Sequence, residues 1–312
     1  MNSRFYEVKI TLGSVKKIRA GILLLITTFF WGVTFTVVKD AISKVDVFVF
    51  LSQRFLIAAA IMLPIALTRT NRVKARLLTH GTILGILLFA SYAFQTVALK
   101  YTSASNTGFL TGLSVLLVPL FGAAIFRHAV GAGIRWGVGL ATPGLFLLCT
   151  DGSLSFNIGD ILGAICGACV ALHLLYTSHF TRHADSDVYL LTTLQLSVVG
   201  LLSLASAQAR GQEVFVWHPE LLWTLVVCVL IATIFAFLVQ TTMQKWISPA
   251  HTALIFCTEP VFAAAYAYYA AGERLGVLGL LGAVLILAGM IVSELLPDGA
   301  DSDASVSVAA EG

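Results

Sequence analysis

Charge is scarce in this sequence. Only 11% of the 312 residues are Asp, Glu, Lys or Arg, and 58% are hydrophobic, whereas charged residues make up about 25% of an average soluble domain. The scarcity excludes an ordinary soluble globular protein, and a net charge of +3 is too small for an extended nucleic-acid-binding surface. The composition therefore indicates a chain that crosses a lipid bilayer many times and that binds no nucleic acid.

Cysteine is also sparse, and its positions argue against disulfides and metal binding. All five cysteines lie inside apolar stretches, where Cys behaves as a small hydrophobic residue. Cys166 and Cys169 have the spacing of half a zinc site, but the sequence holds no second pair. His179 and His183 would share one face of a helix, yet they lie at a membrane boundary among ordinary solvated residues. We therefore expect neither a metal nor another cofactor.

Enzyme motifs are missing as well. An intramembrane hydrolase would need paired Asp residues within the membrane or a His-Glu-x-x-His helix, and the sequence has neither. No Walker-type phosphate-binding loop is present, which argues against ATP-driven transport within this chain. The sequence therefore predicts a protein that is not an enzyme.

What the sequence has instead is a succession of apolar segments of membrane-spanning length. The first covers residues 20–38 and lacks a small-residue cleavage site, so we expect it to be retained as a span and not removed as a signal peptide. The later segments cover residues 48–67, 79–99, 105–126, 133–150, 159–180, 188–207, 221–244, 249–271 and 275–295. The prediction is an all-α membrane protein with ten transmembrane helices.

The predicted helices divide into two sequence repeats. Residues 95–107 (QTVALKYTSASNT) align with residues 240–252 (QTTMQKWISPAHT), with five identities. The copies match again at Pro119/Pro260, after a four-residue difference in spacing, which is about one helical turn. They also match at Gly137/Gly282 and Gly144/Gly289, in the original spacing. Five helices per repeat is an odd number, so the second copy enters the membrane from the opposite side. The sequence therefore predicts two inverted five-helix repeats.

Four regions follow from this division. They are an N-terminal arm of residues 1–19, a first repeat of residues 20–150, a second repeat of residues 159–295 and a disordered tail of residues 297–312. With the N-terminus inside, thirteen of the Lys and Arg residues fall on inner segments and five on outer loops, and cytoplasmic loops carry such an excess. We therefore expect both termini in the cytoplasm and the chain in the plasma membrane, the inner membrane of a bacterium.

Several short motifs together resemble a known family. They are Trp31-Gly32, Tyr101-Thr102-Ser103-Ala104, Ser248-Pro249-Ala250, Glu259-Pro260-Val261-Phe262 and Gly272-Glu273-Arg274. Their combination is similar to the EamA family of the drug/metabolite transporter superfamily, and the resemblance spans about residues 20–295. It implies a ten-helix carrier whose relatives move amino acids, nucleotide sugars, triose phosphates or other small metabolites, often as exporters in bacteria.

An inverted repeat also suggests a mechanism. It offers two arrangements of similar energy that open to opposite sides, which is the basis of alternating access around a site near the midplane. We therefore predict a secondary transporter that moves a small, amino-acid-like or related metabolite, with export the expected direction. The alternative is a non-transporting sensor or scaffold built on the same duplicated bundle. The sequence does not specify an oligomeric state.

Glu259 and two prolines are the first candidate site residues. Glu259 lies near the middle of the ninth predicted span, where a charge costs about 2.5–3.5 kcal/mol on insertion scales, so we expect it to be protonated or paired. It is either a proton-coupling or amine-binding carboxylate, or a structural acid that caps a broken helix. Pro119 and Pro260 each free a carbonyl one turn upstream, which either binds substrate or merely accompanies a packing kink.

Two repeat-related pairs come next. Gln95 and Gln240 occupy equivalent positions, and their amides either contact substrate in a common cavity or hydrogen-bond neighbouring helices. Asn106 and His251 are also equivalent, at the starts of the fourth and ninth predicted helices. Helix capping is the alternative to substrate contact for that second pair.

Four further residues complete the candidate set. His173, midway along the sixth span, either titrates in a hydrated cavity or is a satisfied core histidine. Trp31 and Tyr92 either form the wall of a substrate cavity or pack as ordinary aromatic residues. Arg54 lies within the second span, and its long side chain is expected to reach the outer surface, with attraction of an anionic substrate as the alternative.

Overall fold

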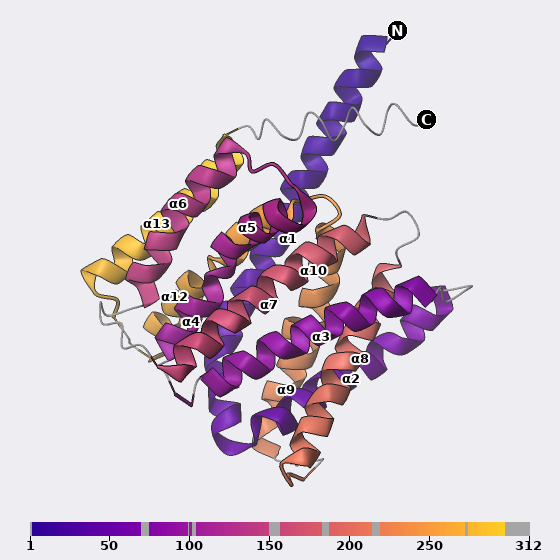
Figure 1. The fold of residues 1–312 in the computed structure, drawn as a ribbon, viewed down its shortest axis with the longest axis vertical. Helices are drawn as coiled ribbons and strands as arrows, with labels where there is room; N and C mark the ends of the chain where they lie inside the picture. The colour runs from indigo at the N-terminus through magenta and orange to yellow at the C-terminus, as the bar shows by residue number, and fades with distance from the viewer. Residues whose placement is uncertain are drawn as a thin grey trace. The chain divides into compact units, whose positions relative to one another are not determined.

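Helices make up the whole of the described secondary structure. The computed structural model describes residues 2–69, 75–98, 100–101, 104–149, 157–182, 187–213, 219–271 and 274–296, and it has no strand among them. The first helices are α1 (Asn2–Lys44), α2 (Val47–Arg69), α3 (Ala75–Ala98), α4 (Ala104–Gly112), α5 (Ser114–Phe126) and α6 (Ala132–Cys149). The later ones are α7 (Ile158–Thr181), α8 (Val188–Ala209), η1 (Pro219–Leu221), α9 (Leu222–Val229), η2 (Leu230–Phe235), α10 (Ala236–Met243), α11 (Pro249–Phe256), α12 (Glu259–Ala271) and α13 (Val277–Leu295). The predicted all-α membrane class is confirmed (Figure 1).

The predicted spans correspond to helices with one exception. Within the described residues, nine helical stretches are long and apolar enough to cross a membrane. Residues 249–271 were expected to be a tenth span, but they form two shorter helices, α11 and α12, with a turn at Cys257 and Thr258 between them. The interruption that Glu259-Pro260 led us to expect therefore lies at the two residues before Glu259, and the count of ten spans stays a prediction.

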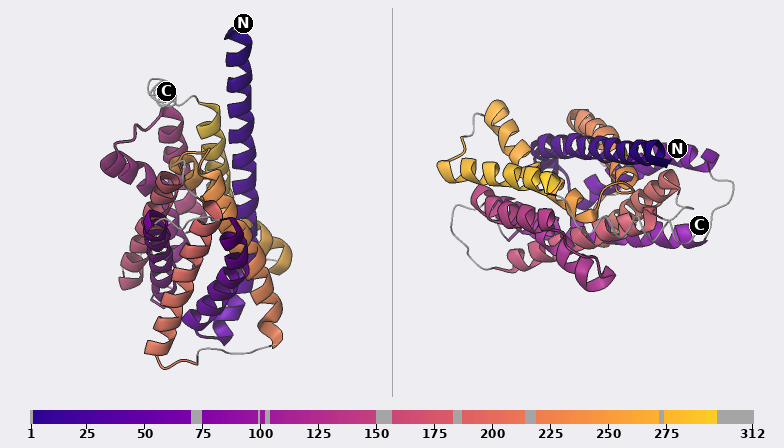
Figure 2. Two further views of the ribbon diagram at one scale, coloured as in Figure 1. Left: turned by 90° about the vertical axis from the view of Figure 1, so that its right-hand side faces the viewer. Right: turned by 90° about the horizontal axis from the view of Figure 1, so that it is seen from above.

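The N-terminal arm is part of the first helix. Helix α1 runs without a break for 43 residues, so the arm of residues 1–19 continues into the first span (Figure 2). The apolar stretch of membrane length within it is Val15–Thr34, earlier than the predicted span of residues 20–38. The predicted tail, residues 297–312, lies outside the described residues.

The chain divides into two compact units that cut across the sequence repeats. Unit 1 contains residues 1–92 and 176–248, and unit 2 contains residues 93–175 and 249–312. Each unit therefore takes helices from both repeats. Within each unit, the most extensive packing joins the same helix of the two repeats: α2 with α8 in unit 1, and α6 with α13 in unit 2.

In unit 1, large apolar side chains lie between α2 and α8. The core contains the fully buried Phe55, Leu196 and Val199, with Phe237 of α10 against them. Gly200 of α8 lies against Leu56 of α2, because a Cβ at Gly200 would lie 2.8 Å from the Leu56 Cδ2 atom and 2.9 Å from the Leu56 backbone nitrogen. A bulky side chain on one helix thus fills the space left by a glycine on the other.

In unit 2, α6 and α13 pack backbone against backbone. A Cβ at Gly144 would lie 2.8 Å from the Gly282 carbonyl oxygen, and a Cβ at Gly282 would lie 2.5 Å from the Gly144 carbonyl oxygen. Gly137 and Gly289 form a second such pair, with distances of 2.9 Å and 2.6 Å. The two helices run antiparallel, because the pairing connects higher residue numbers on one helix with lower numbers on the other.

The glycine pairs also carry information about symmetry. Gly137 is the repeat equivalent of Gly282, and Gly144 of Gly289, yet each glycine packs against the equivalent of the other. Reciprocal contacts of this kind occur where two copies are related by a twofold axis. An antiparallel, twofold-related pair is what an inverted repeat predicts for its fifth helices.

Candidate functional site

Arg54 of α2 is a buried cation at the centre of unit 1. Its side chain is only 4% exposed. Its Nε donates a hydrogen bond to the Thr233 hydroxyl at 2.6 Å, and its Nη2 donates to the Ala232 carbonyl at 3.0 Å. The expectation that Arg54 reaches the outer surface is wrong, because acceptors inside the unit bind its guanidinium.

Both acceptors belong to η2, a single π-helical stretch between α9 and α10. In a π turn the backbone N–H pairs with the carbonyl five residues earlier, which shifts the hydrogen-bond ladder, and such turns are frequent at functional sites. The Ala232 carbonyl accepts a second hydrogen bond, from the Trp31 indole Nε1 of α1 at 2.9 Å. One carbonyl of η2 therefore connects to both α1 and α2.

Trp31 and Tyr92, the two predicted cavity-wall residues, lie with Arg54 in unit 1. We call the four rings of Trp31, Phe55, Tyr92 and Phe237 the aromatic cluster. Trp31 lies 5.7 Å from Phe237 and Phe55 lies 5.3 Å from Tyr92, measured between ring centroids. Trp31 and Tyr92 are half-buried, whereas Phe55 and Phe237 are buried. The structure thus brings Trp31 and Tyr92 together near Arg54, which the sequence had led us to expect at the outer surface.

Buried amides form a second polar group in unit 1. Gln240 of α10 is buried, and its Nε2 lies 3.4 Å from Oε1 of Gln244, one turn later. Gln195 of α8 donates from its Nε2 to the Thr241 hydroxyl at 3.2 Å. Sequence reasoning missed Gln195 and Gln244. Gln195 had a usable signal, because it is the one amide in the predicted span of residues 188–207.

Gln95, the repeat partner of Gln240, belongs to unit 2. Its Nε2 donates to the Thr111 hydroxyl at a long 3.5 Å, and that hydroxyl lies 3.5 Å from the Cys166 Sγ. Each of the two predicted amides therefore has a polar neighbour within its own unit. A common cavity for Gln95 and Gln240 stays a prediction.

The fourth helix of each repeat is interrupted at a comparable place in unit 2. In the first repeat α4 ends at Gly112 and α5 begins at Ser114. In the second repeat α11 ends at Phe256 and α12 begins at Glu259. Discontinuous helices of this kind form the binding sites of many secondary transporters.

The two prolines stand differently relative to these breaks. Pro119 lies inside α5, whereas Pro260 is the second residue of α12. In the first turn of a helix the missing N–H of proline costs nothing. The Thr258 carbonyl accepts hydrogen bonds from the backbone N–H groups of Val261 at 3.0 Å and Phe262 at 3.2 Å, which close that turn. Pro260 therefore begins a helix and does not kink one.

Glu259 is the first residue of α12 and is half-buried. A carboxylate is favoured at a helix N-terminus by the positive end of the helix dipole. Within the described part of the chain, no hydrogen bond or ion pair joins the Glu259 carboxylate to another residue. The residue thus stands at the interruption with its carboxylate available for other partners.

The three remaining candidates also lie in unit 2. His251 is the third residue of α11, and its Nε2 lies 3.2 Å from the Ser293 carbonyl oxygen, so its ring contacts the neighbouring helix α13. Asn106 lies in α4, but its side chain is outside the described ones. His173 is buried in α7, beside the core residues Leu174 and Leu175.

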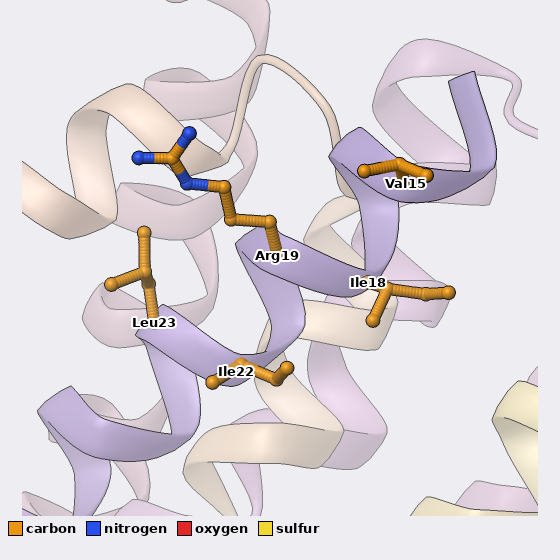
Figure 3. A pocket seen from close by; sticks show the side chains of 5 residues that line it. All are labelled: Val15, Ile18, Arg19, Ile22 and Leu23. Carbon is orange, nitrogen blue, oxygen red and sulfur yellow. The ribbon is translucent and has the colours of Figure 1, made fainter. Parts of the chain in front are cut away.

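A hollow on the surface of α1 lies apart from these residues. It is lined by Val15, Ile18, Arg19, Ile22 and Leu23 (Figure 3). Apart from Arg19 the lining is aliphatic, and Val15, Ile18 and Ile22 are exposed. Such a surface suits contact with lipid chains better than recognition of a polar metabolite.

Comparison with known proteins decides the family. The model of the EamA-like transporter family matches the chain twice, over residues 18–150 and 157–295. This chain belongs to the EamA-like transporter family. That family is part of the drug/metabolite transporter superfamily. The double match agrees with the duplication read from residues 95–107 and 240–252, and it makes the chain a multi-pass membrane protein of a transporter family.

Similar proteins cover almost the whole EamA chain. An uncharacterized transporter of Archaeoglobus fulgidus is 32% identical over 285 residues, which is 90% of this chain and 87% of the relative. A second one from that organism is 24% identical and covers 87% of this chain and 96% of the relative. The uncharacterized transporter YyaM of Bacillus subtilis is 27% identical and covers 89% of this chain and 94% of the relative. A crystal structure with a TM-score of 0.75 and 19% identity covers 89% of this chain and 96% of that chain, so the fold is shared.

Proposed function

We propose that this EamA protein is a secondary transporter that exports a small, amino-acid-like or related metabolite by alternating access. The observation that carries the proposal is the reciprocal packing of Gly137 with Gly289 and of Gly144 with Gly282. Reciprocal, antiparallel contacts between repeat-equivalent positions support an inverted repeat, and inverted repeats are the structural basis of alternating access. The direction of transport rests on the family resemblance.

The proposed binding groups are the candidates that the sequence indicates. They are Trp31, Tyr92, Gln95, Asn106, Pro119, His173, Gln240, His251 and Pro260. The helix interruptions support this choice, because discontinuous helices form the binding sites of many secondary transporters.

Glu259 is the proposed proton-coupling residue. A carboxylate without a partner charge costs less to bury when it carries a proton. An alternation between a dry and a wet surrounding would therefore make Glu259 bind and release a proton in each cycle. Its position at the start of α12, beside the interruption, supports this role.

The test uses purified protein and the Glu259→Gln variant. A thermal-shift screen against amino acids, nucleosides and sugars identifies a ligand that raises Tm, and that compound is then used in proteoliposomes. We expect wild type to show counterflow and accumulation driven by a pH gradient, and the variant to keep counterflow but lose accumulation. Unchanged accumulation in the variant would refute coupling through Glu259. A stabilising ligand without any counterflow would favour the sensor or scaffold alternative.

We also propose that both termini face the cytoplasm and that the chain lies in the plasma membrane. The uneven distribution of Lys and Arg supports this orientation. In a background without the five native cysteines, Ser153→Cys should react with an impermeant maleimide added outside intact cells. Labelling only from the cytoplasmic side would contradict the proposed orientation.

A further inference from the structure

We propose that Arg54 binds the oxyanion group of the transported substrate, and that this substrate is an organic anion with an apolar or aromatic body. The inference rests on the proposed transport function and specifies its substrate class. It is drawn entirely from residues of unit 1, namely Arg54 on α2, η2 and the aromatic cluster.

The first reason is that the charge of Arg54 is not compensated. No carboxylate among the described side chains forms an ion pair with it. Arg210 of the same unit is a useful contrast, because its side chain is 42% exposed and its Nη2 lies 3.8 Å from Asp46 Oδ2. A buried charge is costly unless an opposite charge accompanies it. An anionic ligand would supply the charge that the surrounding residues do not.

The second reason is the set of donors that remain. A guanidinium has five N–H donors in a fixed fork. The edge formed by Nε and Nη2 is used, because Thr233 and the Ala232 carbonyl accept from it. Nη1 makes no hydrogen bond to any described residue. The end of the fork, formed by Nη1 and Nη2, is therefore available, and it matches the two oxygens of a carboxylate or phosphate.

The third reason is orientation. The bonds to Thr233 and Ala232 fix the guanidinium plane against η2, so the free end of the fork has one direction and not many. The second hydrogen bond to the Ala232 carbonyl, from Trp31, holds that carbonyl in place. A binding group held in this way loses little conformational entropy when a ligand arrives.

The fourth reason concerns the body of the substrate. The Arg54 Cζ lies 5.3 Å from the Phe55 ring centroid and 6.0 Å from that of Tyr92. Apolar surroundings strengthen the attraction between opposite charges, and aromatic rings pack well against apolar or aromatic groups. Trp31 and Tyr92 are the half-buried members of the aromatic cluster, so they have surface to offer to a ligand. Inorganic phosphate would use the charge but not this surface.

The alternative is that Arg54 only joins α2 to η2. A purely structural arginine needs its two hydrogen bonds and has no use for an anion. The two roles differ in whether the protein gains stability from an anion through Arg54.

The experiment measures Tm of the purified full chain in detergent at constant ionic strength. The probes are benzoate, phenyl phosphate, the neutral isostere benzamide and inorganic phosphate. We expect benzoate or phenyl phosphate to raise Tm saturably and benzamide to have no effect, since a ligand that binds the folded state stabilises it. Which of the two organic anions has the larger effect identifies the oxyanion as carboxylate or phosphate.

Variants assign the effect to Arg54. Arg54→Gln should lose the anion-dependent shift, and Arg54→Lys should retain only part of it, because a lysine keeps the charge but not the fork. Arg210→Gln also removes one positive charge from unit 1, but this variant should keep the full anion-dependent shift in Tm. If Arg54→Gln does not fold, the comparison of benzoate with benzamide on wild type and the Arg54→Lys variant still decides.

Three outcomes would overturn the proposal. They are equal shifts with benzoate and benzamide, a shift with inorganic phosphate alone, and a full benzoate shift in Arg54→Gln. Counterflow of a neutral metabolite, without any anion effect on Tm, would leave the transport function standing and remove only the anionic substrate class.

Discussion

The helix pairs α6–α13 and α2–α8 join the same elements of the two repeats but differ in the side chains that lie between the two helices. In unit 2, glycines of α6 and α13 bring the two backbones into contact, as Gly144 and Gly282 illustrate. In unit 1, α2 and α8 carry large side chains between them and also carry the buried polar residues Arg54 and Gln195. Paired glycines leave little space for long polar side chains, and the buried polar residue Ser293 of α13 is a short one. We call α6–α13 the scaffold pair, whereas α2–α8 carries the long polar side chain of Arg54 to which the proposed substrate class refers.

The largest effect should come from placing a polar side chain in the scaffold pair. Ile286 of α13 is 0% exposed and packs in the apolar core of unit 2. Ile286→Gln should lower the free energy of unfolding by about 3–5 kcal/mol, because it removes apolar packing and buries an amide without a partner. Equilibrium unfolding in mixed detergent measures it. If the free energy of unfolding falls no more than it does for a substitution at an exposed site, then the core of unit 2 tolerates polar residues as that of unit 1 does.

A smaller loss is expected from a single methyl group at the backbone contact. A Cβ at Gly282 would lie 2.5 Å from the Gly144 carbonyl oxygen and 2.6 Å from the Leu148 nitrogen. Gly282→Ala should therefore lower the free energy of unfolding by about 1–3 kcal/mol through overpacking. Gly139→Ala in α6 is the control, because a Cβ there has no atom within 4 Å. The free energy of unfolding of this control should rise by about 0.5–1 kcal/mol, because alanine has the higher helix propensity. Equal effects of the two changes would refute the backbone contact.

The smallest effect concerns one hydrogen bond of unit 1. Trp31→Phe removes the donor to the Ala232 carbonyl but leaves the bond from Arg54 in place. We expect the free energy of unfolding to fall by about 0.5–1.5 kcal/mol. Trp136→Phe on α6 is the matched control, since Trp136 is 65% exposed, and it should change the value by less than about 0.5 kcal/mol. A similar change in the free energy of unfolding of both variants would show that the indole hydrogen bond does not stabilise the fold.

Much of the fold could be predicted because hydropathy and internal repeats are visible in short stretches of the sequence. Apolar runs marked the spans, and the alignment of residues 95–107 with 240–252 marked the duplication. The same alignment paired Gly137 with Gly282, although the cross-packing with Gly289 and Gly144 needed the structure. An interruption near Glu259 was predicted, but its position was wrong, because a proline at the second position begins a helix and does not break one.

The candidate site was less predictable, since its contacts connect distant parts of the chain. The acceptors of Arg54 lie at Ala232 and Thr233, in a π turn with no recognisable sequence signal. A local rule, that long cations reach the membrane surface, therefore gave the wrong position for Arg54. Trp31 and Tyr92 do lie in one aromatic cluster, although a substrate cavity beside them stays a prediction. Gln195 was missed although it is the one amide in its predicted span.

The shared carbonyl of Ala232 has a consequence for motion. Trp31 of α1 and Arg54 of α2 both donate to it, so sliding η2 by one turn would break both bonds together. The segments α1, α2 and η2 should therefore turn as one rigid body during a transport cycle. Flexing costs least where one helix ends and the next begins, as at Leu113 and at Cys257 and Thr258. The hinges of this protein are thus expected in the fourth helix of each repeat, and a spin-label pair that spans α11 and α12 should report the bending.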